Sequence, residues 1–297
     1  PQIDYSSKKS IQEGEEGCLS IPEIRLVAER FDKIKIRYYN EKGEKTKKPL
    51  SGFLSRLFQH ELDHLNGVLM IENSKSHIMP TYGDRKIEFK EGKGCLLTST
   101  ENKTYLDFGG GIAVNSMGHC HPTLVKALQI QASKLWHTSN LYYSSSQEKY
   151  AEILCKNSFA DKIFFTNSGV EAIEAGIKVV RSFHSYHKNL HKKNIITFEG
   201  AFHGRTFAAL SAQQNKKYSD GLEPLMPGFI KVPFNDLLNL KKNINEKVSA
   251  ILLEPVQGEG GVRPFDLNFI EEVKKICVKN NILFFLDEVQ SGFGRSG

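Results

Sequence analysis

The distribution of apolar and polar residues changes along this chain near Ser74–Pro80. Before that point, residues 23–39 alternate between apolar and polar side chains, which predicts half-buried extended structure. A polar turn is expected at Asn40–Lys45, and the periodicity of the next stretch predicts a helix from about Ser51 to Leu65. The first segment is therefore expected to be β-rich with one helix.

After Pro80, short apolar runs alternate with stretches of helical periodicity for about two hundred residues. In residues 171–181, for example, the apolar side chains Ile173, Ile177 and Val180 fall on one helical face. Alternating strands and helices form mostly parallel sheets with helices on both faces, so we expect an α/β fold here. The predicted strands are Lys162–Thr166, Asn194–Phe198, Ala250–Glu254 and Ile282–Asp287.

Composition narrows the class of protein. The 297 residues are 39% hydrophobic and 25% charged, as in an ordinary globular protein of one or two domains. No apolar run reaches a membrane-spanning length, and no signal peptide is visible, so we expect a cytoplasmic protein without a membrane partner. Five widely spaced cysteines fit a reducing compartment. The net charge of +6 is spread thinly, which argues against nucleic-acid binding.

A metal-binding pattern stands in the first segment at residues 60–64, which read His-Glu-Leu-Asp-His. On a helix, His60 and His64 face the same way and can reach one divalent metal. Glu61 lies beside them, near enough to act as a general base on water that the metal activates. The thiolate of Cys18 would be a third ligand, suited to iron or zinc. The alternative is a solvated, charged helix face.

The sequence Glu-Gly-Cys-Leu-Ser at residues 16–20, together with the histidine motif, resembles the peptide deformylases. The resemblance covers about residues 1–73, the C-terminal half of such an enzyme, and implies an α+β fragment. It implies that Cys18, His60 and His64 hold Fe²⁺, or Zn²⁺ as a substitute, and that Glu61 is the general base. The Gly-rich motif of the family, whose Gln stabilises the oxyanion, is expected to lie before this segment, so deformylase activity is expected to be lost.

A phosphate-binding pattern occurs in the second segment at residues 166–171, where a predicted strand leads through a small polar turn into a helix. Free backbone N–H groups and the positive end of the helix dipole would point at one anion. Gly169 would let the backbone approach that anion closely. The alternative is an ordinary helix cap made by Asn167 or Ser168.

Polar residues follow three more of the predicted strands. Asp287 and Glu254 each end an apolar run, and a Gly-rich loop at residues 199–206 follows another. Ligands of open α/β sheets bind beyond the carboxyl ends of the strands, so these residues are expected to share one rim. An acid there could keep a pyridine nitrogen protonated and make the ring an electron sink. Turns and caps explain each loop separately, but explain the set less well.

Residues 78–297 closely resemble the class III pyridoxal-phosphate-dependent aminotransferases, and within them the acetylornithine aminotransferases. The resemblance runs through the motifs at 106–108, 111–115, 118–119 and 137–142, and it implies the large domain of fold type I, in truncated form. It further implies that Gly169 and Val170 bind the cofactor phosphate, that Phe202 stacks on the pyridine ring, and that Asp287 pairs with its nitrogen. The other residues it assigns to the site are Gln290 at the phenolic oxygen, Glu254 lining the site, Arg205 at the substrate carboxylate and Glu259 as a switch between substrates.

Two departures from that family matter. Ile173 stands where the family usually has Asn, which changes local hydrogen bonding. The lysine that holds the cofactor covalently is expected downstream of Gly297, so the chain as given is expected to be inactive.

The sequence is therefore interpreted as two joined pieces: a deformylase fragment over residues 1–76 and an incomplete aminotransferase over residues 77–297, with the junction at about Ser74–Ile78. The expected reaction is transamination between N-acetylornithine, or a related ω-amino donor, and 2-oxoglutarate in arginine biosynthesis, by a homodimer in its complete form. Metal-dependent deformylation and a non-catalytic chimeric fragment are the alternatives.

Two weaker signals are set aside. The spacing of His184, His187 and His191 suits a metal, but the neighbouring lysines favour a solvated helix end. Trp136 and Tyr142 lack the basic groove of a nucleic-acid platform and are expected in the core or a dimer interface.

Overall fold

The computed structural model describes residues 1–7, 10–70, 78, 81–82 and 87–296 of the chain. It contains two compact units, one made of Pro1–Gly92 with Leu96–Leu106 and the other of Lys93–Cys95 with Asp107–Gly297. The junction expected at residues 74–78 falls almost entirely outside the described residues. None of the described helices combines the length and apolar character needed to cross a membrane.

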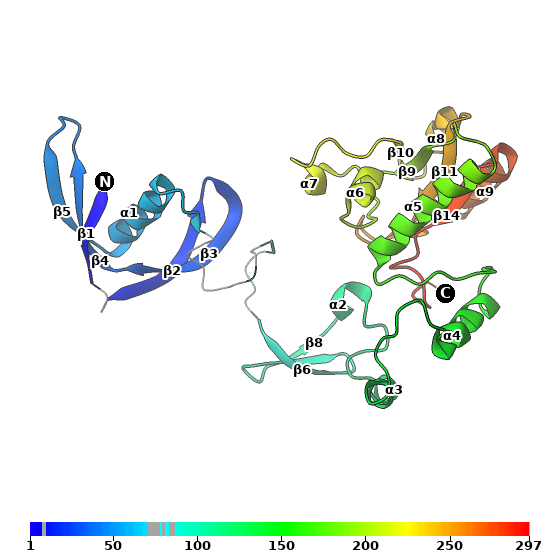
Figure 1. The fold of residues 1–297 in the computed structure, drawn as a ribbon, viewed down its shortest axis with the longest axis horizontal. Helices are drawn as coiled ribbons and strands as arrows, with labels where there is room; N and C mark the ends of the chain where they lie inside the picture. Colours follow the sequence, from blue (N-terminus) through cyan, green and yellow to red (C-terminus); the bar gives the residue numbers. More distant parts are fainter. Residues whose placement is uncertain (8–9, 71–77, 79–80, 83–86, 297) are drawn as a thin grey trace. The chain divides into compact units, whose positions relative to one another are not determined.

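The first unit consists of antiparallel strands and one helix (Figure 1). Two of its sheets have the orders β1-β4-β5 and β2-β3, and the helix α1 packs against β3, β4 and β5. The extended segment, the turn and the helix that the sequence predicted are all present. Their bounds are β1 Gln2–Ser6, β2 Ile11–Cys18, β3 Ile21–Phe31, β4 Lys33–Tyr39, β5 Lys45–Ser51 and α1 Gly52–Leu65.

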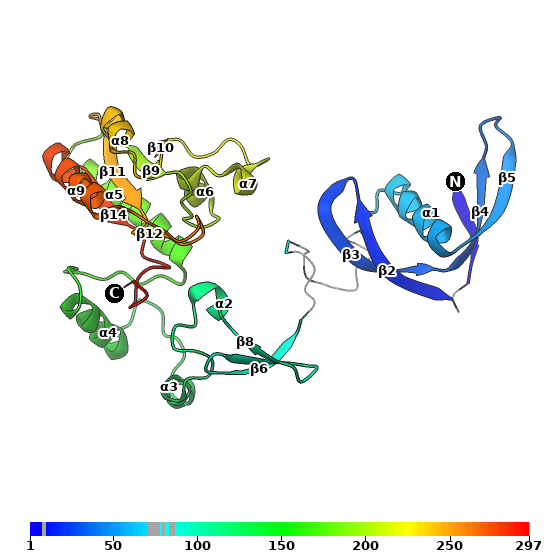
Figure 2. The same ribbon diagram turned by 180° about the vertical axis from the view of Figure 1, so that it is seen from behind.

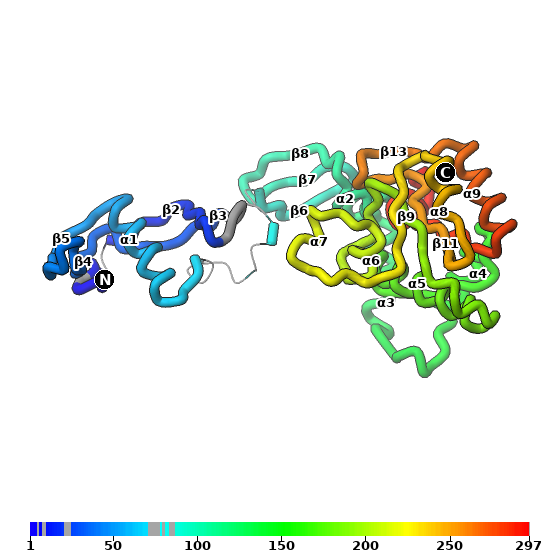
Figure 3. The backbone as a smooth tube through the Cα atoms, turned by 90° about the horizontal axis from the view of Figure 1, so that it is seen from above, coloured from blue at the N-terminus to red at the C-terminus, as the bar shows by residue number. Residues whose placement is uncertain are grey.

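Three short strands follow the first segment and lie together in one sheet (Figure 3). Their order is β6-β7-β8, and β7 and β8 are antiparallel. After them come three helices without an intervening strand. The bounds are β6 Phe89–Lys93, β7 Leu96–Ser99, β8 Thr104–Leu106, α2 Gly110–Ala113, α3 Pro122–Ala132 and α4 Ser145–Lys156.

The second unit is built on a parallel sheet of order β10-β9-β11-β14, as the alternation of strands and helices predicted. A separate pair, β12 and β13, forms a small antiparallel ladder. Figure 2 shows the sheet and its helices from behind. The bounds are α5 Gly169–Tyr186, β9 Asn194–Phe198, α6 Phe207–Gln213, α7 Lys216–Ser219, β10 Phe229–Val232, α8 Leu237–Asn243, β11 Val248–Leu253, β12 Val256–Gln257, β13 Arg263–Pro264, α9 Leu267–Asn280 and β14 Leu283–Leu286.

Helices cover both faces of this sheet. Successive residues of β11 alternate between two apolar clusters: Ile251 and Leu253 face one, and Ala250 and Leu252 face the other. Residues of α8 and α9 fill the first cluster, and residues of α5 and α6 fill the second. Because successive side chains of a strand point to opposite faces, a strand buried on both sides reads as one continuous apolar run. This confirms the expected sheet with helices on both faces.

The order of the strands creates a switch point between β9 and β11. The chain runs from β9 outward to β10, crosses back to β11 on the other side of β9, and continues outward to β14. Open α/β sheets bind ligands outside the carboxyl ends of the strands at such a point. The loops that leave β9, β11 and β14 all begin at that edge.

One predicted strand is absent from the structure. Lys162–Thr166 is irregular and pairs with no strand among the described residues. An apolar run specifies burial, whereas a strand also needs a neighbour to complete its ladder of hydrogen bonds. Phe164 is 81% exposed, and Phe165 stacks on Tyr150 of α4 instead.

Candidate functional sites

The N-terminus of α5 forms a cap and leaves backbone donors free. The Ser168 hydroxyl accepts the N–H of Glu171 at 3.3 Å, and the Glu171 carboxylate accepts the N–H of Asn167 at 2.6 Å. The cap interpretation of this turn is therefore correct, and Ser168 is the capping residue. It does not exclude an anion site, because the N–H groups of Gly169 and Val170 make no hydrogen bond to another described residue. Both groups border a cavity.

That cavity brings together the six residues that the sequence assigned to the cofactor. They are Gly169, Val170, Phe202, Glu254, Asp287 and Gln290, and the remaining lining residues are His203, Gly204 and Val289. The contributing loops follow β9, β11 and β14, whose carboxyl ends share one edge of the sheet. A set of residues from four separate stretches of sequence thus meets at the switch point.

Close packing around the glycines shapes this cavity. A Cβ atom on Gly169 would lie 2.6 Å from Val289 Cγ1, so no larger residue fits there unless Val289 moves. Similarly, a Cβ atom on Gly258 would lie 2.1 Å from the side-chain oxygen of Gln290. Glycine at these two positions lets the helix end and the Gln290 amide reach the cavity.

Asp287 is held by two hydrogen bonds. Its Oδ2 lies 2.7 Å from Nδ1 of His203, and its Oδ1 accepts the N–H of Val289 at 3.1 Å. A carboxylate only accepts, so Nδ1 of His203 carries the proton of this bond. The imidazole is almost fully buried, and its Nε2 has no hydrogen-bond partner among the described residues. His203 thus fixes the orientation of the acid, a role that the sequence did not assign.

Glu254 lies in the same cavity and is 5% exposed. Burial raises its pKa to about 7, and the neighbouring Asp287 charge adds to the rise, while the N–H of Phe202 and the ring of His203 oppose it. The Phe202 N–H donates to Glu254 Oε1 at 2.9 Å. This bond ties the backbone of the predicted ring-stacking residue to the loop after β11.

Arg205 and Glu259, the two predicted substrate residues, lie outside the set that lines the cavity. Both are exposed, and both contact Tyr218 of α7. The guanidinium carbon of Arg205 lies 5.0 Å from the centre of the Tyr218 ring. The Tyr218 hydroxyl donates to Glu259 Oε1 at 3.0 Å. Sequence reasoning missed Tyr218 because it belongs to no motif; only the contacts reveal it.

The donor set of the cavity fits pyridoxal phosphate. Two free N–H groups at a helix end suit a phosphate, and a buried, hydrogen-bonded carboxylate suits a protonated pyridine nitrogen. The aromatic ring of Phe202, which also lines the cavity, suits a planar heterocycle. No lysine is among the described residues that line it. Ile173, at the position where Asn was expected, is buried in the apolar cluster beneath α5 and does not line the cavity.

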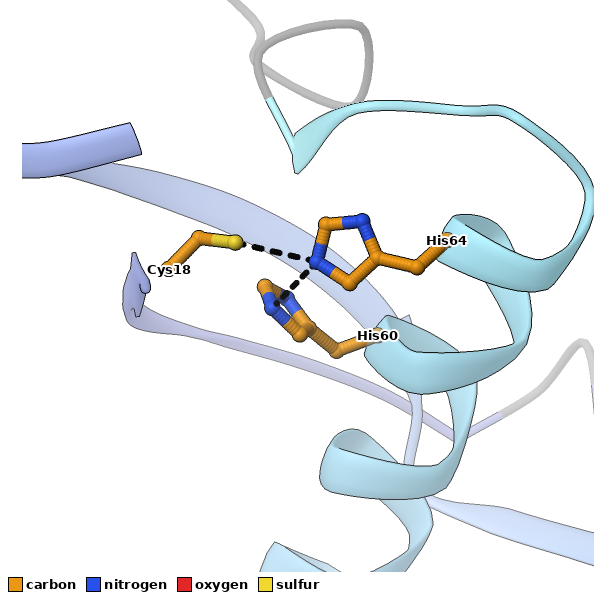
Figure 4. Close-up of side chains that lie close together, drawn as sticks. All are labelled: Cys18, His60 and His64. Atoms are coloured by element: carbon orange, nitrogen blue, oxygen red, sulfur yellow. Dashed lines mark hydrogen bonds between the residues drawn. The ribbon is translucent and has the colours of Figure 1, made fainter. Parts of the chain in front are cut away.

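The first unit gathers Cys18, His60 and His64, whose ligand atoms all lie within 4.8 Å of one another (Figure 4). The sulfur of Cys18 is 2.9 Å from Nε2 of His64, which is 3.2 Å from Nε2 of His60. The two histidines lie one turn apart on α1, and the cysteine is the last residue of β2. This donor set, one sulfur and two imidazole nitrogens, fits a zinc or ferrous ion.

A buried ionic network orients the triad. The Glu16 carboxylate lies 3.2 Å from Nδ1 of His60, which leaves Nε2 of that ring directed at the other two ligands. Arg30 binds the same carboxylate through two nitrogens at 2.9 and 3.0 Å, and the Arg56 Nε lies 3.0 Å from it. Arg30 also pairs with Asp63 of α1. Such outer contacts fix the tautomer and the orientation of a metal ligand.

The thiol of Cys18 is prepared for deprotonation. Partial desolvation opposes the change, but hydrogen bonds from Ser20, His60 and His64 lower its pKa to about 7. The triad opens on a cavity of about 350 Å³, which Glu61 also lines. The predicted general base is therefore beside the predicted metal ligands, as the sequence suggested.

The signals that were set aside have structural explanations. His184 is buried and its Nε2 bonds the carbonyl of Ser249 at 2.9 Å, so it is part of the core rather than of a solvated helix end. Trp136 and Tyr142 are 86% and 69% exposed, so the expectation that they belong to the core is wrong. Their neighbours in the sequence, Leu135, Leu141 and Tyr143, are also exposed.

Comparisons with known proteins match two families to two consecutive parts of the chain. Residues 79–297 match the family model described as aminotransferase class-III, and residues 1–78 match the one described as polypeptide deformylase. Acetylornithine aminotransferase 1 of Bradyrhizobium diazoefficiens is 47% identical over 230 residues, which are 77% of this chain and 57% of that protein. An acetylornithine aminotransferase of Bacillus anthracis is 47% identical over 75% of this chain and 56% of its own length.

Solved structures give the same result for the fold. N-acetylornithine aminotransferase from Stenotrophomonas maltophilia aligns with a TM-score of 0.62 and 38% identity, over 71% of this chain and 53% of its own. An ornithine aminotransferase from Toxoplasma gondii aligns with a TM-score of 0.71 and 26% identity, over 75% and 53%. The chain thus spans little more than half the length of the relatives it matches.

Proposed function

Because this chain belongs to the class-III aminotransferases, we propose that residues 79–297 form the cofactor-binding part of an enzyme that transfers an amino group with pyridoxal phosphate. The observation that carries the proposal is the single cavity lined by all six predicted cofactor residues. They come from the N-terminus of α5 and from the loops after three parallel strands. Chance turns and caps would not converge in this way.

The reaction we propose takes the amino group from N-acetylornithine, or a related ω-amino donor, and passes it to 2-oxoglutarate in arginine biosynthesis. Support comes from relatives named acetylornithine aminotransferase at 47% identity. The exposed apolar residues around Trp136 are consistent with a homodimer in the complete protein. A cytoplasmic location is part of the same proposal.

The residues of this chain have separate tasks in that reaction. When bound, pyridoxal phosphate supplies an electron sink for the bonds at the substrate carbon. Gly169 and Val170 bind its phosphate through backbone N–H groups, and Phe202 packs on the ring and excludes water. Asp287, oriented by His203, holds the proton at the pyridine nitrogen. The Gln290 amide contacts the phenolic oxygen.

Substrate recognition falls to the exposed pair outside the cavity. The Arg205 guanidinium takes the substrate carboxylate through two parallel hydrogen bonds. Glu259 changes which of the two substrates is favoured. Since no described lysine lines the cavity, we propose that this stretch binds the cofactor without completing turnover.

Pyridoxamine 5′-phosphate is the appropriate probe, because it has no aldehyde and cannot condense with the many surface lysines. We expect the full chain to bind it with 1:1 stoichiometry in calorimetry. Asp287→Ala should weaken binding about tenfold or more, because a charged hydrogen bond in a buried site is lost. Asp220→Asn, which changes an exposed carboxylate of the same unit, should leave the affinity unchanged.

Two results would count against the cofactor site. One is an absence of pyridoxamine phosphate binding by a folded chain. The other is binding that Asp287→Ala and Asp220→Asn weaken equally. Binding of pyridoxamine phosphate without any transamination would support the proposal that this stretch binds the cofactor but does not complete turnover.

A second function, metal-dependent removal of a formyl group from a peptide, is favoured by the triad of Cys18, His60 and His64 and by the family match of residues 1–78. A bound Fe²⁺ or Zn²⁺ would supply Lewis-acid polarisation of the formyl carbonyl. Glu61 would take the proton of the attacking water, and the backbone N–H of Leu19 would donate to the carbonyl oxygen.

Co²⁺ is a spectroscopic probe of the site formed by Cys18, His60 and His64, because a thiolate ligand gives Co²⁺ a strong near-ultraviolet charge-transfer band. We expect the full chain to show that band, Cys18→Ser to abolish it, and Cys155→Ser in the other unit to retain it. Hydrolysis of a formylated peptide by the metal-loaded chain would support the deformylase function. A chain that binds Co²⁺ but leaves the peptide intact would limit the segment to metal binding.

A further inference from the structure

Tyr218 links the two substrate residues to the cofactor cavity. Its ring lies under the Arg205 guanidinium, at 5.0 Å from the guanidinium carbon to the ring centre. Its hydroxyl donates to Glu259 at 3.0 Å. The edge of its ring meets Phe202, with 5.9 Å between ring centres and an interplanar angle of 74°. One half-buried side chain therefore contacts a cation, an anion and the residue expected to stack on the cofactor.

Tyr218 contacts two side chains of opposite charge, Arg205 and Glu259, that could otherwise form an ion pair with each other. Arg205 and Glu259 are long, exposed side chains of opposite charge that contact the same ring. If they paired, Glu259 would occupy the guanidinium edge that a substrate carboxylate needs. No ion pair between them occurs among the described residues. The carboxylate instead accepts from the phenol, and the guanidinium lies against the π face.

We propose that Tyr218 is a positioning residue that keeps Glu259 away from Arg205 and so keeps the guanidinium available for the carboxylate of a dicarboxylic 2-oxo acid. The inference rests on the proposed function, because it takes Arg205 as the carboxylate-binding residue. The hydroxyl does the restraining, since it holds Glu259. The ring positions the guanidinium, which lies over the ring face.

Two substitutions separate these contributions. Tyr218→Phe removes the hydroxyl and keeps the ring, so Glu259 becomes free to pair with Arg205. Glu259→Gln removes the competing charge. If Tyr218 acts through Glu259, the first substitution weakens carboxylate binding only when Glu259 is still a carboxylate. If Tyr218 has only a structural role, Tyr218→Phe weakens binding in both backgrounds.

The measurement is the affinity of the full chain, loaded with pyridoxamine 5′-phosphate, for glutarate, an unreactive dicarboxylate. We expect Tyr218→Phe to weaken glutarate binding about two- to fivefold, the effect of one competing exposed ion pair. In the Glu259→Gln background the same change should alter affinity by less than about twofold. Lys217→Met is the matched control. Its cation lies 5.4 Å from the same ring, and its loss should have little effect.

The outcomes distinguish this inference from the function on which it rests. If the wild-type chain binds pyridoxamine phosphate but not glutarate, the assignment of Arg205 fails, and the role of Tyr218 fails with it. If glutarate binds and Tyr218→Phe has no effect, only the role of Tyr218 is overturned. An equal loss in both backgrounds also overturns it, and circular dichroism checks that each variant is folded.

Discussion

Glu254 gives a quantitative test of how strongly the cavity at the switch point buries its carboxyl group. The carboxyl group is 5% exposed, and burial raises its pKa from 4.5 to about 7. A pKa difference of one unit between the folded and the unfolded chain corresponds to about 1.4 kcal/mol. Ionisation of Glu254 therefore lowers the free energy of unfolding by about 3 kcal/mol. Glu254→Gln removes the ionisation, and its amide oxygen still accepts from the Phe202 N–H.

The sign of the pH effect on stability depends on whether the folded or the unfolded chain loses the Glu254 proton first. Below pH 4.5 the carboxyl is protonated in both the folded and the unfolded chain, and its ionisation contributes nothing. Between about 4.5 and 7 the unfolded chain loses the proton and the folded chain keeps it, so the folded state loses stability as the pH rises. Above about pH 7 the penalty is constant. The advantage of Glu254→Gln should therefore grow by about 3 kcal/mol across this window.

Urea denaturation at several pH values between 4.5 and 8, followed by far-ultraviolet circular dichroism, measures that advantage in the cofactor-free chain. Glu246→Gln, which changes an exposed carboxylate of the same unit, is the control and should give a difference that does not vary with pH. A difference for Glu254→Gln that is flat, or that shrinks as the pH rises, would refute the reasoning.

Three further perturbations test the two sites. Glu16→Gln should lower Co²⁺ affinity about 10- to 100-fold, measured by titration of the charge-transfer band, because the ring of His60 loses its charged partner. Gly169→Ala should destabilise the chain by about 1–3 kcal/mol in urea, since its Cβ would overlap Val289, and Val289→Ala should restore part of the loss. His203→Ala should lower the free energy of unfolding by about 3–5 kcal/mol in the same assay, because it leaves the buried Asp287 carboxylate without its partner. An unchanged urea midpoint would contradict the pairing of His203 with Asp287.

Local pattern was sufficient for several elements of the fold. The period-3.6 repeat of Ile173, Ile177 and Val180 predicted α5, and these three residues are buried as expected. The apolar runs of β9, β11 and β14 predicted a sheet covered on both faces. The pattern failed at Lys162–Thr166, where the residues suit a strand but no neighbouring strand completes the ladder among the described residues. Pairing is a property of two segments, and one segment does not encode it.

Motifs led to the candidate metal ligands and the candidate cofactor residues because each motif carries its chemistry within a few positions. Cys18 and the two histidines came from two such motifs, and the structure places their ligand atoms together. The roles of Glu16 and Arg30 were not predicted. Buried charged side chains at these positions acquire a function only through the partners that the fold gives them.

The sequence by itself indicated the α/β class of the second unit, several of its helices and strands, and the residues proposed to carry chemistry. These properties depend on side-chain type and short-range periodicity, which a sequence displays directly. The tertiary structure alone decided that His203 orients Asp287, that burial raises the pKa of Glu254, and that Tyr218 stands between Arg205 and Glu259. Those facts depend on distances between residues far apart in sequence and on exclusion of water, and both arise only when the chain folds.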